Sequence, residues 1–281
     1  MPETYVSLFV NSAYAKEGEL AAIGLLFLFL ARMLPIIALS PFLGARVLPN
    51  PTKVMLAITL FIVFLPQLLI TTTKPLGFNP MLVVYMIKEV FIGLCIGFLI
   101  SIPFIIVQTA GIIIDHQRGG ASLMVNDPTI QNQSSPLGTL YNTVLIVVFY
   151  MVDGPFLFIE AIMHSYEVLP VDQFLNPAFF TEHSSFWKMI LDILNDVMRL
   201  AIQIASPSLI AILMTDVFLG VANRLAPQVQ ITFLGMPIKS LLGLAVICVG
   251  WGLITDEFAK QARIWLNHVY DMIKFFQYVP S

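Results

Sequence analysis

Ionisable side chains set inside long apolar segments are the residues of this sequence whose types and spacing could do chemistry. A charge that faces hydrocarbon is costly, so each of these side chains should face protein or water. The chemistry open to them is ion pairing, along a polar pathway or at a subunit contact. The alternative is a charge near a helix end whose stem reaches the membrane surface. These residues are Arg32, Lys88, Glu89, Asp192, Asp196, Arg199, Asp216 and Lys239.

The positions of three charges separate these two interpretations. Arg32 and Asp216 lie within apolar segments, so we expect each of them to have a buried partner. Lys88 follows Met81 by only seven residues, which favours a side chain that reaches the membrane surface.

A polar stripe is predicted in the fifth apolar segment. Asp192, Asp196 and Arg199 are separated by four and then three residues, which places them on one face of a helix. This spacing predicts an ion pair between Asp196 and Arg199. We expect the stripe to meet another subunit.

Motifs for catalysis, cofactor binding or metal binding are absent from the sequence. It contains no G-x-S-x-G, no H-E-x-x-H and no Walker loop. Cys95 and Cys248 both lie in apolar segments, where a small apolar side chain is favoured over a disulfide or a metal pair. Asp115 and His116 could relay protons, but a solvated helix end is favoured for them. We expect no enzyme activity, no cofactor, no metal and no nucleic acid partner.

The composition is that of an integral membrane protein. Hydrophobic residues make up 58% of the chain and charged residues 11%, whereas soluble domains carry about 25% charged residues. The mean hydropathy is +0.88. The first residues are acidic and lack the basic start and small-residue cleavage site of a secretory signal, so we expect no cleavage there.

Six apolar segments are long enough for membrane helices, which need roughly 20 mostly apolar residues. Backbone groups cannot stay unpaired in hydrocarbon, and the alternation typical of a barrel is absent, so we predict an all-α fold of the integral-membrane type. The segments are 20–43, 54–73, 81–114, 128–152, 186–220 and 231–254.

Two of these segments are too long for one crossing. Residues 81–114 would extend about 50 Å as a single helix, against a hydrocarbon core of roughly 30 Å. Proline removes an amide donor and kinks a helix. We therefore predict breaks at 101–103, which contains Pro103, and at 206–208, which contains Pro207, so that each segment forms a hairpin.

The longest polar stretch, 115–138, lies between the third and fourth segments. Gly119 and Gly120 permit unusual backbone angles, and Asn126-Asp127-Pro128 is typical of a turn. A connection of this length is functional or disordered. The apolar residues 123–125 in its middle favour a structured, functional loop.

Several motifs resemble the FliR/SctT family, the export-gate subunits of flagellar and virulence type III secretion systems. The strongest is DVFLGVANRLAPQVQITFLGMPIKS at 216–240. The others are Arg32 with Pro35, PFLGARVLP at 41–49, KEVFIGLCIGF at 88–98, AGIIIDHQRGG at 110–120 and QSSPLGTLYN at 133–142, in the order of the family. The resemblance covers about residues 20–255, and the 223–240 region looks more like the virulence branch than the flagellar one.

The resemblance implies a core subunit of a helical export gate in the bacterial inner membrane, raised toward the periplasm in the assembly. It implies a hetero-oligomer with SctR/FliP-like, SctS/FliQ-like, SctU/FlhB-like and SctV/FlhA-like subunits, with inner-rod or needle components, and with unfolded secreted proteins in transit. By the same resemblance, residues 1–183 correspond to the larger SctR/FliP-like partner. Residues 184–281 correspond to the smaller, hairpin-like SctS/FliQ-like partner, and the two parts form one functional unit.

Two groups of site residues follow from the resemblance. A loop from this subunit is expected to plug the closed pore, where flexible apolar side chains can seal without specific bonds. A second group is expected to hold subunits in register; the alternative for its 224–239 part is an ordinary turn between helices. The plug loop comprises His116, Gln117, Arg118, Gly119, Gly120, Leu123, Met124, Val125, Asn126, Gln131 and Gln133. The register motif comprises Arg32, Lys88, Glu89, Asp216, Asn223, Arg224, Pro227, Gln228, Met236, Pro237 and Lys239.

Two other functions stay open from the sequence. A small-molecule secondary transporter often has broken helices at corresponding places in its two halves, and Pro103 and Pro207 resemble such a pair. No inverted repeat supports that interpretation. A scaffold without a pore fits the composition equally well, and only the loop and the motif order disfavour it.

Overall fold

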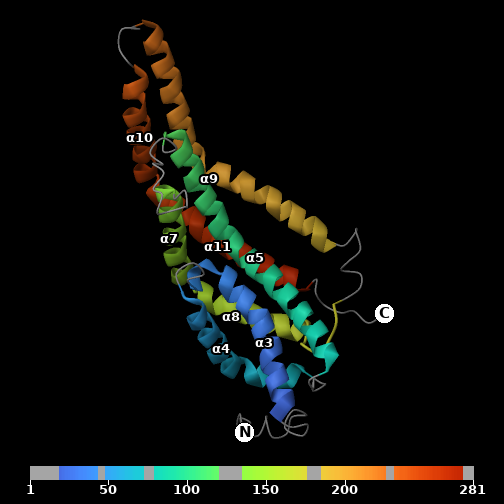
Figure 1. The fold of residues 1–281 in the computed structure, drawn as a ribbon. Helices are drawn as coiled ribbons and strands as arrows, with labels where there is room; N and C mark the ends of the chain where they lie inside the picture. The colour runs from blue at the N-terminus through green and yellow to red at the C-terminus, as the bar shows by residue number, and fades with distance from the viewer. Residues whose placement is uncertain are drawn as a thin grey trace. The chain divides into compact units, whose positions relative to one another are not determined.

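The fold is helical throughout the part of the chain that the structure describes. The computed structural model describes residues 19–43, 48–72, 79–119, 135–175, 185–225 and 231–274, and no strand occurs among them (Figure 1). The prediction of an all-α fold is confirmed. The elements are α3 (Glu19–Leu39), the short 3-10 helix η1 (Pro41–Leu43), α4 (Asn50–Thr71), α5 (Pro80–Gln117), α7 (Pro136–Met151), α8 (Gly154–Val168), α9 (Ser185–Leu225), α10 (Ile231–Val249) and α11 (Trp251–Lys274).

Four of these helices are long and apolar enough to cross a membrane by themselves. They contain the stretches Ala21–Leu39, Asn50–Thr71, Pro80–Gln117 and Ile190–Leu225. Two consecutive pairs, α7 with α8 and α10 with α11, also qualify if each is one broken span, which gives up to six spans. This agrees with the six segments predicted from the sequence.

The predicted breaks at Pro103 and Pro207 are wrong. α5 continues through Pro103, and α9 continues through Pro207. Proline cannot donate to the carbonyl four residues earlier, which for Pro207 is the carbonyl of Gln203. The Ser206 hydroxyl donates a hydrogen bond of 2.8 Å to that same carbonyl. The acceptor therefore stays satisfied, and the helix does not need to end.

Breaks occur instead at Asp153, between α7 and α8, and at Gly250, between α10 and α11. Asp153 has a left-handed φ of 57°, which no helix interior accepts. Pro155 then lies in the first turn of α8, where the amide that it lacks has no partner in any case. Helix breaks thus exist, as bends of 76° and 65°, but at other residues than we predicted.

Two helices, α8 and α11, were not expected from the apolar segments. α8 is only 15 residues long and carries Glu160 and Glu167. α11 buries Phe258 and Trp265 while its other face carries exposed charges such as Lys260. A search for uncharged runs misses an amphipathic helix of this kind.

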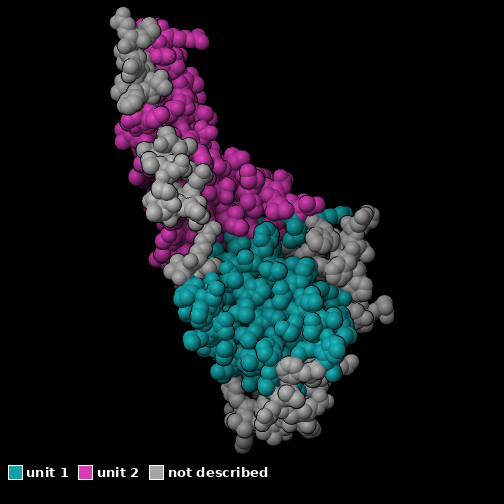
Figure 2. Space-filling model, viewed as in Figure 1, with its two compact units in different colours: residues 1–101, 153–190, 264–281 teal, residues 102–152, 191–263 magenta. Residues whose placement is uncertain are grey.

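One of two compact units, unit 1, consists of residues 1–101, 153–190 and 264–281 (Figure 2). Its core is aromatic. The centroid of the Phe29 ring on α3 lies 5.4 Å from that of Phe61 and 5.7 Å from that of Phe64, both on α4. Tyr166 on α8 stacks on Phe29 at 5.7 Å. Aromatic pairs at such distances add to the free energy of burial, so the cluster holds α3, α4 and α8 together.

Two glycines bring α5 close to α3 within unit 1. A Cβ atom at Gly93 would overlap the backbone carbonyl of Arg32, and one at Gly97 would lie 3.1 Å from the Cα of Ile36. Residues four apart share a helix face, so both glycines face α3. The contact sets Arg32 near Glu89, which lies one turn before Gly93 on α5.

Unit 2 consists of residues 102–152 and 191–263. In it, α9 and α10 run antiparallel as a hairpin (Figure 1). A Cβ at Gly235 of α10 would lie 3.1 Å from Leu219 of α9, and one at Gly243 would lie 3.1 Å from Ile212. Neither unit is continuous in sequence, so the two units do not correspond to the predicted parts 1–183 and 184–281. The predicted division at residue 183 therefore stays a prediction.

Candidate functional site

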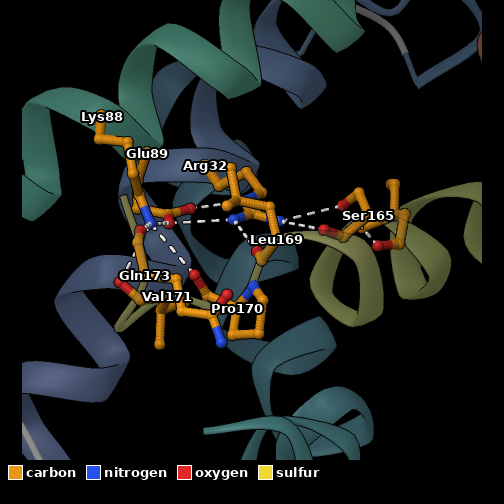
Figure 3. A network of polar contacts seen from close by, with 9 residues as sticks. Arg32, Lys88, Glu89, Ser165, Leu169, Pro170, Val171 and Gln173 are labelled. Atoms are coloured by element: carbon orange, nitrogen blue, oxygen red, sulfur yellow. Dashed lines mark hydrogen bonds and ion pairs between the residues drawn. The ribbon is translucent and has the colours of Figure 1, made fainter. Parts of the chain in front are cut away.

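Arg32 is completely buried and donates from every guanidinium N–H. Its Nε and Nη2 donate to the two carboxylate oxygens of Glu89 on α5, the second at 2.9 Å. Nη1 donates to the carbonyl of Ser165 at 3.0 Å and to its hydroxyl at 3.1 Å, and Nη2 also donates to the carbonyl of Leu169 at 2.9 Å. The Tyr166 ring lies 4.0 Å from the guanidinium carbon. The prediction of a buried partner for Arg32 is confirmed (Figure 3).

Lys88 is also buried, so the prediction that its stem reaches the membrane surface is wrong. Its Nζ donates to the carbonyls of Pro170 at 3.2 Å, Val171 at 3.1 Å and Gln173 at 2.8 Å. The same Nζ lies 2.8 Å from Oε1 of Glu89. The physical reason is the turn after α8, whose carbonyls supply a polar cage that the sequence did not reveal (Figure 3).

This network joins α3, α5 and α8 by charge as well as by packing. Glu89 serves both cations, and backbone carbonyls satisfy the remaining donors. Burying ions is costly, so such a pair adds little net stability, but removing one partner costs about 3–5 kcal/mol. The arrangement can therefore specify one geometry of the three helices.

Sequence reasoning missed Ser165 and the turn at 169–173. Ser165 belongs to a polar stretch without a recognisable motif. The turn acts through backbone carbonyls, which carry no side-chain signal. The available clue was the excess of cations over carboxylates at Arg32, Lys88 and Glu89, which requires further acceptors nearby.

A second polar cluster lies in unit 2, where one carboxylate joins the end of α5 to the start of α7. Asp115 is buried; its Oδ1 accepts from Nε of Arg118 at 2.8 Å and from Nη2 at 2.6 Å. Its Oδ2 accepts from the Ser135 hydroxyl and from the amide of Leu137 at 3.0 Å. The Ser135 oxygen accepts from the amide of Gly138 at 2.9 Å and so caps α7. We call Asp115, Arg118 and Ser135 the helix-end clamp.

The clamp corrects one expectation and extends the cluster to α10. His116 is exposed as expected for a solvated helix end, but Asp115 is not. Arg118 also donates from Nη1 to the Ser240 hydroxyl of α10 at 3.5 Å. Residues from three of the family-like motifs therefore meet in unit 2.

Asp216 of α9 pairs with Lys239 of α10 across the hairpin. Both side chains are partly exposed, so the predicted partner of Asp216 exists but is not fully buried. Nearer the start of α9, the Arg199 guanidinium lies 3.9 Å from the Asp196 carboxylate, which confirms the predicted pair. Both of those side chains are exposed.

The other predicted site residues are divided between helix ends and undescribed parts of the chain. His116 and Gln117 end α5, Asn223 and Arg224 lie exposed in the last turns of α9, and Met236 and Pro237 lie within α10. Gly119 follows α5 with φ 91°. Outside the described residues lie Gly120, Leu123, Met124, Val125, Asn126, Gln131, Gln133, Pro227 and Gln228.

The fold and these contacts define a helical protein of the integral-membrane type. Most of the charged side chains described within its apolar helices have partners inside the chain. The particular family follows from sequence comparison. The chain belongs to the family described as "Bacterial export proteins, family 1", whose model matches residues 23–263. This confirms the resemblance to the FliR/SctT family.

Three relatives illustrate the similarity. The chain is 34% identical to "Yop proteins translocation protein T" of Yersinia pestis over 164 residues. This stretch covers 58% of this chain and 60% of the relative. It is 34% identical to "Surface presentation of antigens protein SpaR" of Shigella flexneri, over 58% of this chain and 61% of the relative. It is 29% identical to "Flagellar biosynthetic protein FliR" of Aquifex aeolicus, over 85% of this chain and 86% of the relative. The chain thus matches about three fifths of the first two relatives.

Proposed function

We propose that this protein is a core subunit of a type III secretion export gate. In this role it helps to form and close the bacterial inner-membrane pore through which unfolded proteins are secreted. The observation that carries the proposal is the match of residues 23–263 to the bacterial export family. The relatives named for Yop protein translocation and for surface presentation of antigens reach 34% identity, against 29% for the flagellar relative. This difference favours a virulence-type system.

The geometry supports a subunit whose shape is fixed before it meets its partners. Arg32, Lys88 and Glu89 make their described contacts within unit 1, so their part in the register motif is to set the shape of the subunit. Asp216 and Lys239 set the hairpin of unit 2 in the same way. Arg224 and Met236 are exposed and can contact neighbouring subunits directly.

The pore plug belongs to the same proposal. Residues 116–133 contain the apolar run Leu123, Met124 and Val125, which can close a pore without a specific bond to any passing sequence. The helix-end clamp supports this proposal because it ties the residues just before and after 120–134 to a single carboxylate. A plug must be anchored at both ends if it is to return to one place.

The proposed partners are the SctR/FliP-like, SctS/FliQ-like, SctU/FlhB-like and SctV/FlhA-like gate subunits, inner-rod or needle components, and unfolded proteins in transit. Within this assembly residues 1–183 would take the place of a SctR/FliP-like subunit and 184–281 that of a SctS/FliQ-like subunit.

A small-molecule transporter is now less well supported. That alternative rested on discontinuous helices at Pro103 and Pro207, and both helices are continuous there.

The test is purification of the tagged protein from its native membranes in mild detergent, followed by size separation and identification of the proteins that stay bound. We expect one large complex that contains the two smaller gate partners. Recovery of a lone monomer or dimer would contradict the proposal and would call for substrate uptake assays instead.

A further inference from the structure

A narrow apolar groove lies in unit 2 beside the break between α10 and α11. Its volume is about 510 Å³, within the roughly 300–1,000 Å³ typical of sites that hold small molecules. One turn of a helix about 10 Å across would fill most of this volume, so the groove can take an extended chain or single side chains but not a whole helix. Its apolar walls include Ile204 and Pro207 of α9, Ala245 and Val246 of α10, and Leu253 and Ile254 of α11.

One end of the groove is polar. The Ser208 hydroxyl of α9 lies opposite the Gly243 carbonyl of α10, at 3.5 Å. Since the two helices are antiparallel, Gln203 lies toward the end of α10, where α11 begins. Gln203 of α9 and Glu257 of α11 both line the groove and supply polar groups to it.

Both walls change from uncharged to charged sequence at this same end. Residues 200–215 of α9 contain no Asp, Glu, Lys or Arg, and Arg199 comes directly before them. Residues 240–255 are likewise uncharged, and Asp256 and Glu257 follow. The groove therefore crosses an apolar-to-polar boundary of the kind found at a membrane surface.

The charges at the boundary are of both signs, and each cation lies at a long 3.9 Å from a carboxylate, Arg199 from Asp196 and Lys260 from Glu257. Arg199 has a side chain that is 77% exposed, and Lys260 of α11 is 67% exposed. Glu257 accepts from Gln261 at 2.7 Å on one oxygen, and Lys260 lies 3.9 Å from the other. Such a rim complements a headgroup with an ammonium and a phosphate, while a purely anionic headgroup would meet the Glu257 carboxylate.

We propose that this groove binds one acyl chain of a phospholipid with a zwitterionic headgroup. The acyl chain lies along the apolar walls, the ammonium lies at Glu257 and Gln203, and the phosphate lies at Arg199 and Lys260. Such a lipid would fill the space between α9 and the α10–α11 corner and hold the three helices at their present spacing. The inference does not depend on the export-gate proposal.

The experiment uses the full chain in vesicles of equal parts phosphatidylethanolamine and phosphatidylglycerol. A small share of one of the two lipids carries a diazirine near the end of an acyl chain. After illumination, peptide mass spectrometry compares labelling of the groove with labelling of Phe218, an exposed apolar residue of α9 outside the groove. We expect the phosphatidylethanolamine probe to label the groove in preference to Phe218, and the phosphatidylglycerol probe to show no such preference.

A groove-filling variant with a matched control separates a bound lipid from the general lipid layer. Ala245→Phe should reduce groove labelling about tenfold, equivalent to about 1.4 kcal/mol of affinity. Cys248→Phe makes a comparable change at an exposed position of α10 outside the lining and should leave labelling unchanged. If Ala245→Phe does not fold, Leu253→Gln alters the groove at a side chain that is already 77% exposed.

Three outcomes would overturn the proposal. The first is groove labelling no stronger than that of Phe218, which means ordinary contact with bulk lipid. The second is equal labelling by the anionic probe, and the third is groove labelling that Ala245→Phe leaves unchanged. Failure here would leave the export-gate proposal unaffected, because that proposal is tested by the proteins that co-purify.

Discussion

The Arg32 guanidinium and the Glu89 carboxylate face each other as a fork, with Nε and Nη2 of the arginine directed to the two oxygens of the glutamate. Both side chains have no exposed surface. The pair links α3 to α5 at the level where Gly93 lets the two helices touch. Planar bidentate geometry of this kind is specific to arginine, because a lysine ammonium presents a single point charge.

Replacing Glu89 should destabilise the protein more than replacing an exposed glutamate. Glu89→Ala leaves Arg32 and Lys88 buried without their carboxylate, and removing one partner of a buried pair costs about 3–5 kcal/mol. Thermal unfolding in detergent, followed by tryptophan fluorescence, would measure the loss. Glu167→Ala is the control, because that half-exposed carboxylate accepts from Gln67 at 2.7 Å and from the neighbouring His164 and lies outside the Arg32 network. Equal unfolding midpoints for both variants would contradict the network.

A methyl group at Gly93 should be tolerated far less well than one at Gly220. The Cβ of Gly93→Ala would overlap the Arg32 backbone, so α3 and α5 would have to separate and the ion pair would stretch. At Gly220 nothing lies within 4 Å, and alanine should add about 0.5–1 kcal/mol of helix stability. The unfolding midpoint and the amount of folded protein in membranes would measure both effects. A stable Gly93→Ala variant would disprove the close approach of the two helices.

The clamp predicts non-additive effects of two substitutions. Asp115→Ala removes the acceptor for Arg118, Ser135 and the Leu137 amide, whereas Ser135→Ala removes a helix cap worth about 0.5–2 kcal/mol. Because the two residues share one bond network, the double variant should lose less stability than the sum of the single variants. Chemical unfolding of the four proteins would give the coupling free energy. Additive losses would mean that the two ends of 120–134 are held independently.

The sequence predicted the fold class well because uncharged runs of membrane length leave the backbone no choice but a helix. It placed the breaks poorly at Pro103 and Pro207, because a helix can continue through a proline. At Pro207 the Ser206 hydroxyl satisfies the freed carbonyl of Gln203. The breaks at Asp153 and Gly250 depend on local backbone angles that hydropathy does not register.

The candidate site was predicted in part for a similar reason. Charged residues in apolar segments need partners of opposite charge or polar partners, so Arg32 and Asp216 could be predicted to be paired. The acceptors around Lys88 are carbonyls of a turn, and any residue type can supply a carbonyl. Its burial could therefore not be predicted from the sequence alone.

A charge exchange across the α9–α10 hairpin should restore what a single reversal disrupts. Asp216→Lys places two ammonium groups together within an apolar hairpin, and Lys239→Asp places two carboxylates together. The double variant rebuilds a pair of opposite charges with its direction reversed. Co-purification of gate partners should fall in each single variant and recover in the double variant. Glu160→Lys is the control, since it reverses one charge at an exposed residue of α8, outside the register motif and the polar stripe.

Deleting residues 119–126 should make resting membranes leak ions if this loop is the plug. The deletion removes the apolar residues Leu123, Met124 and Val125 but leaves Asp115 and Ser135 in place to hold the helix ends. Ion conductance of membranes that contain the assembled complex would be measured with export inactive. Thr139→Ala changes an exposed residue near the start of α7, outside the plug loop, and serves as the control. An intact complex as ion-tight as the unmodified one after the deletion would refute the plug, whereas a leak with normal assembly would separate closing the pore from building it.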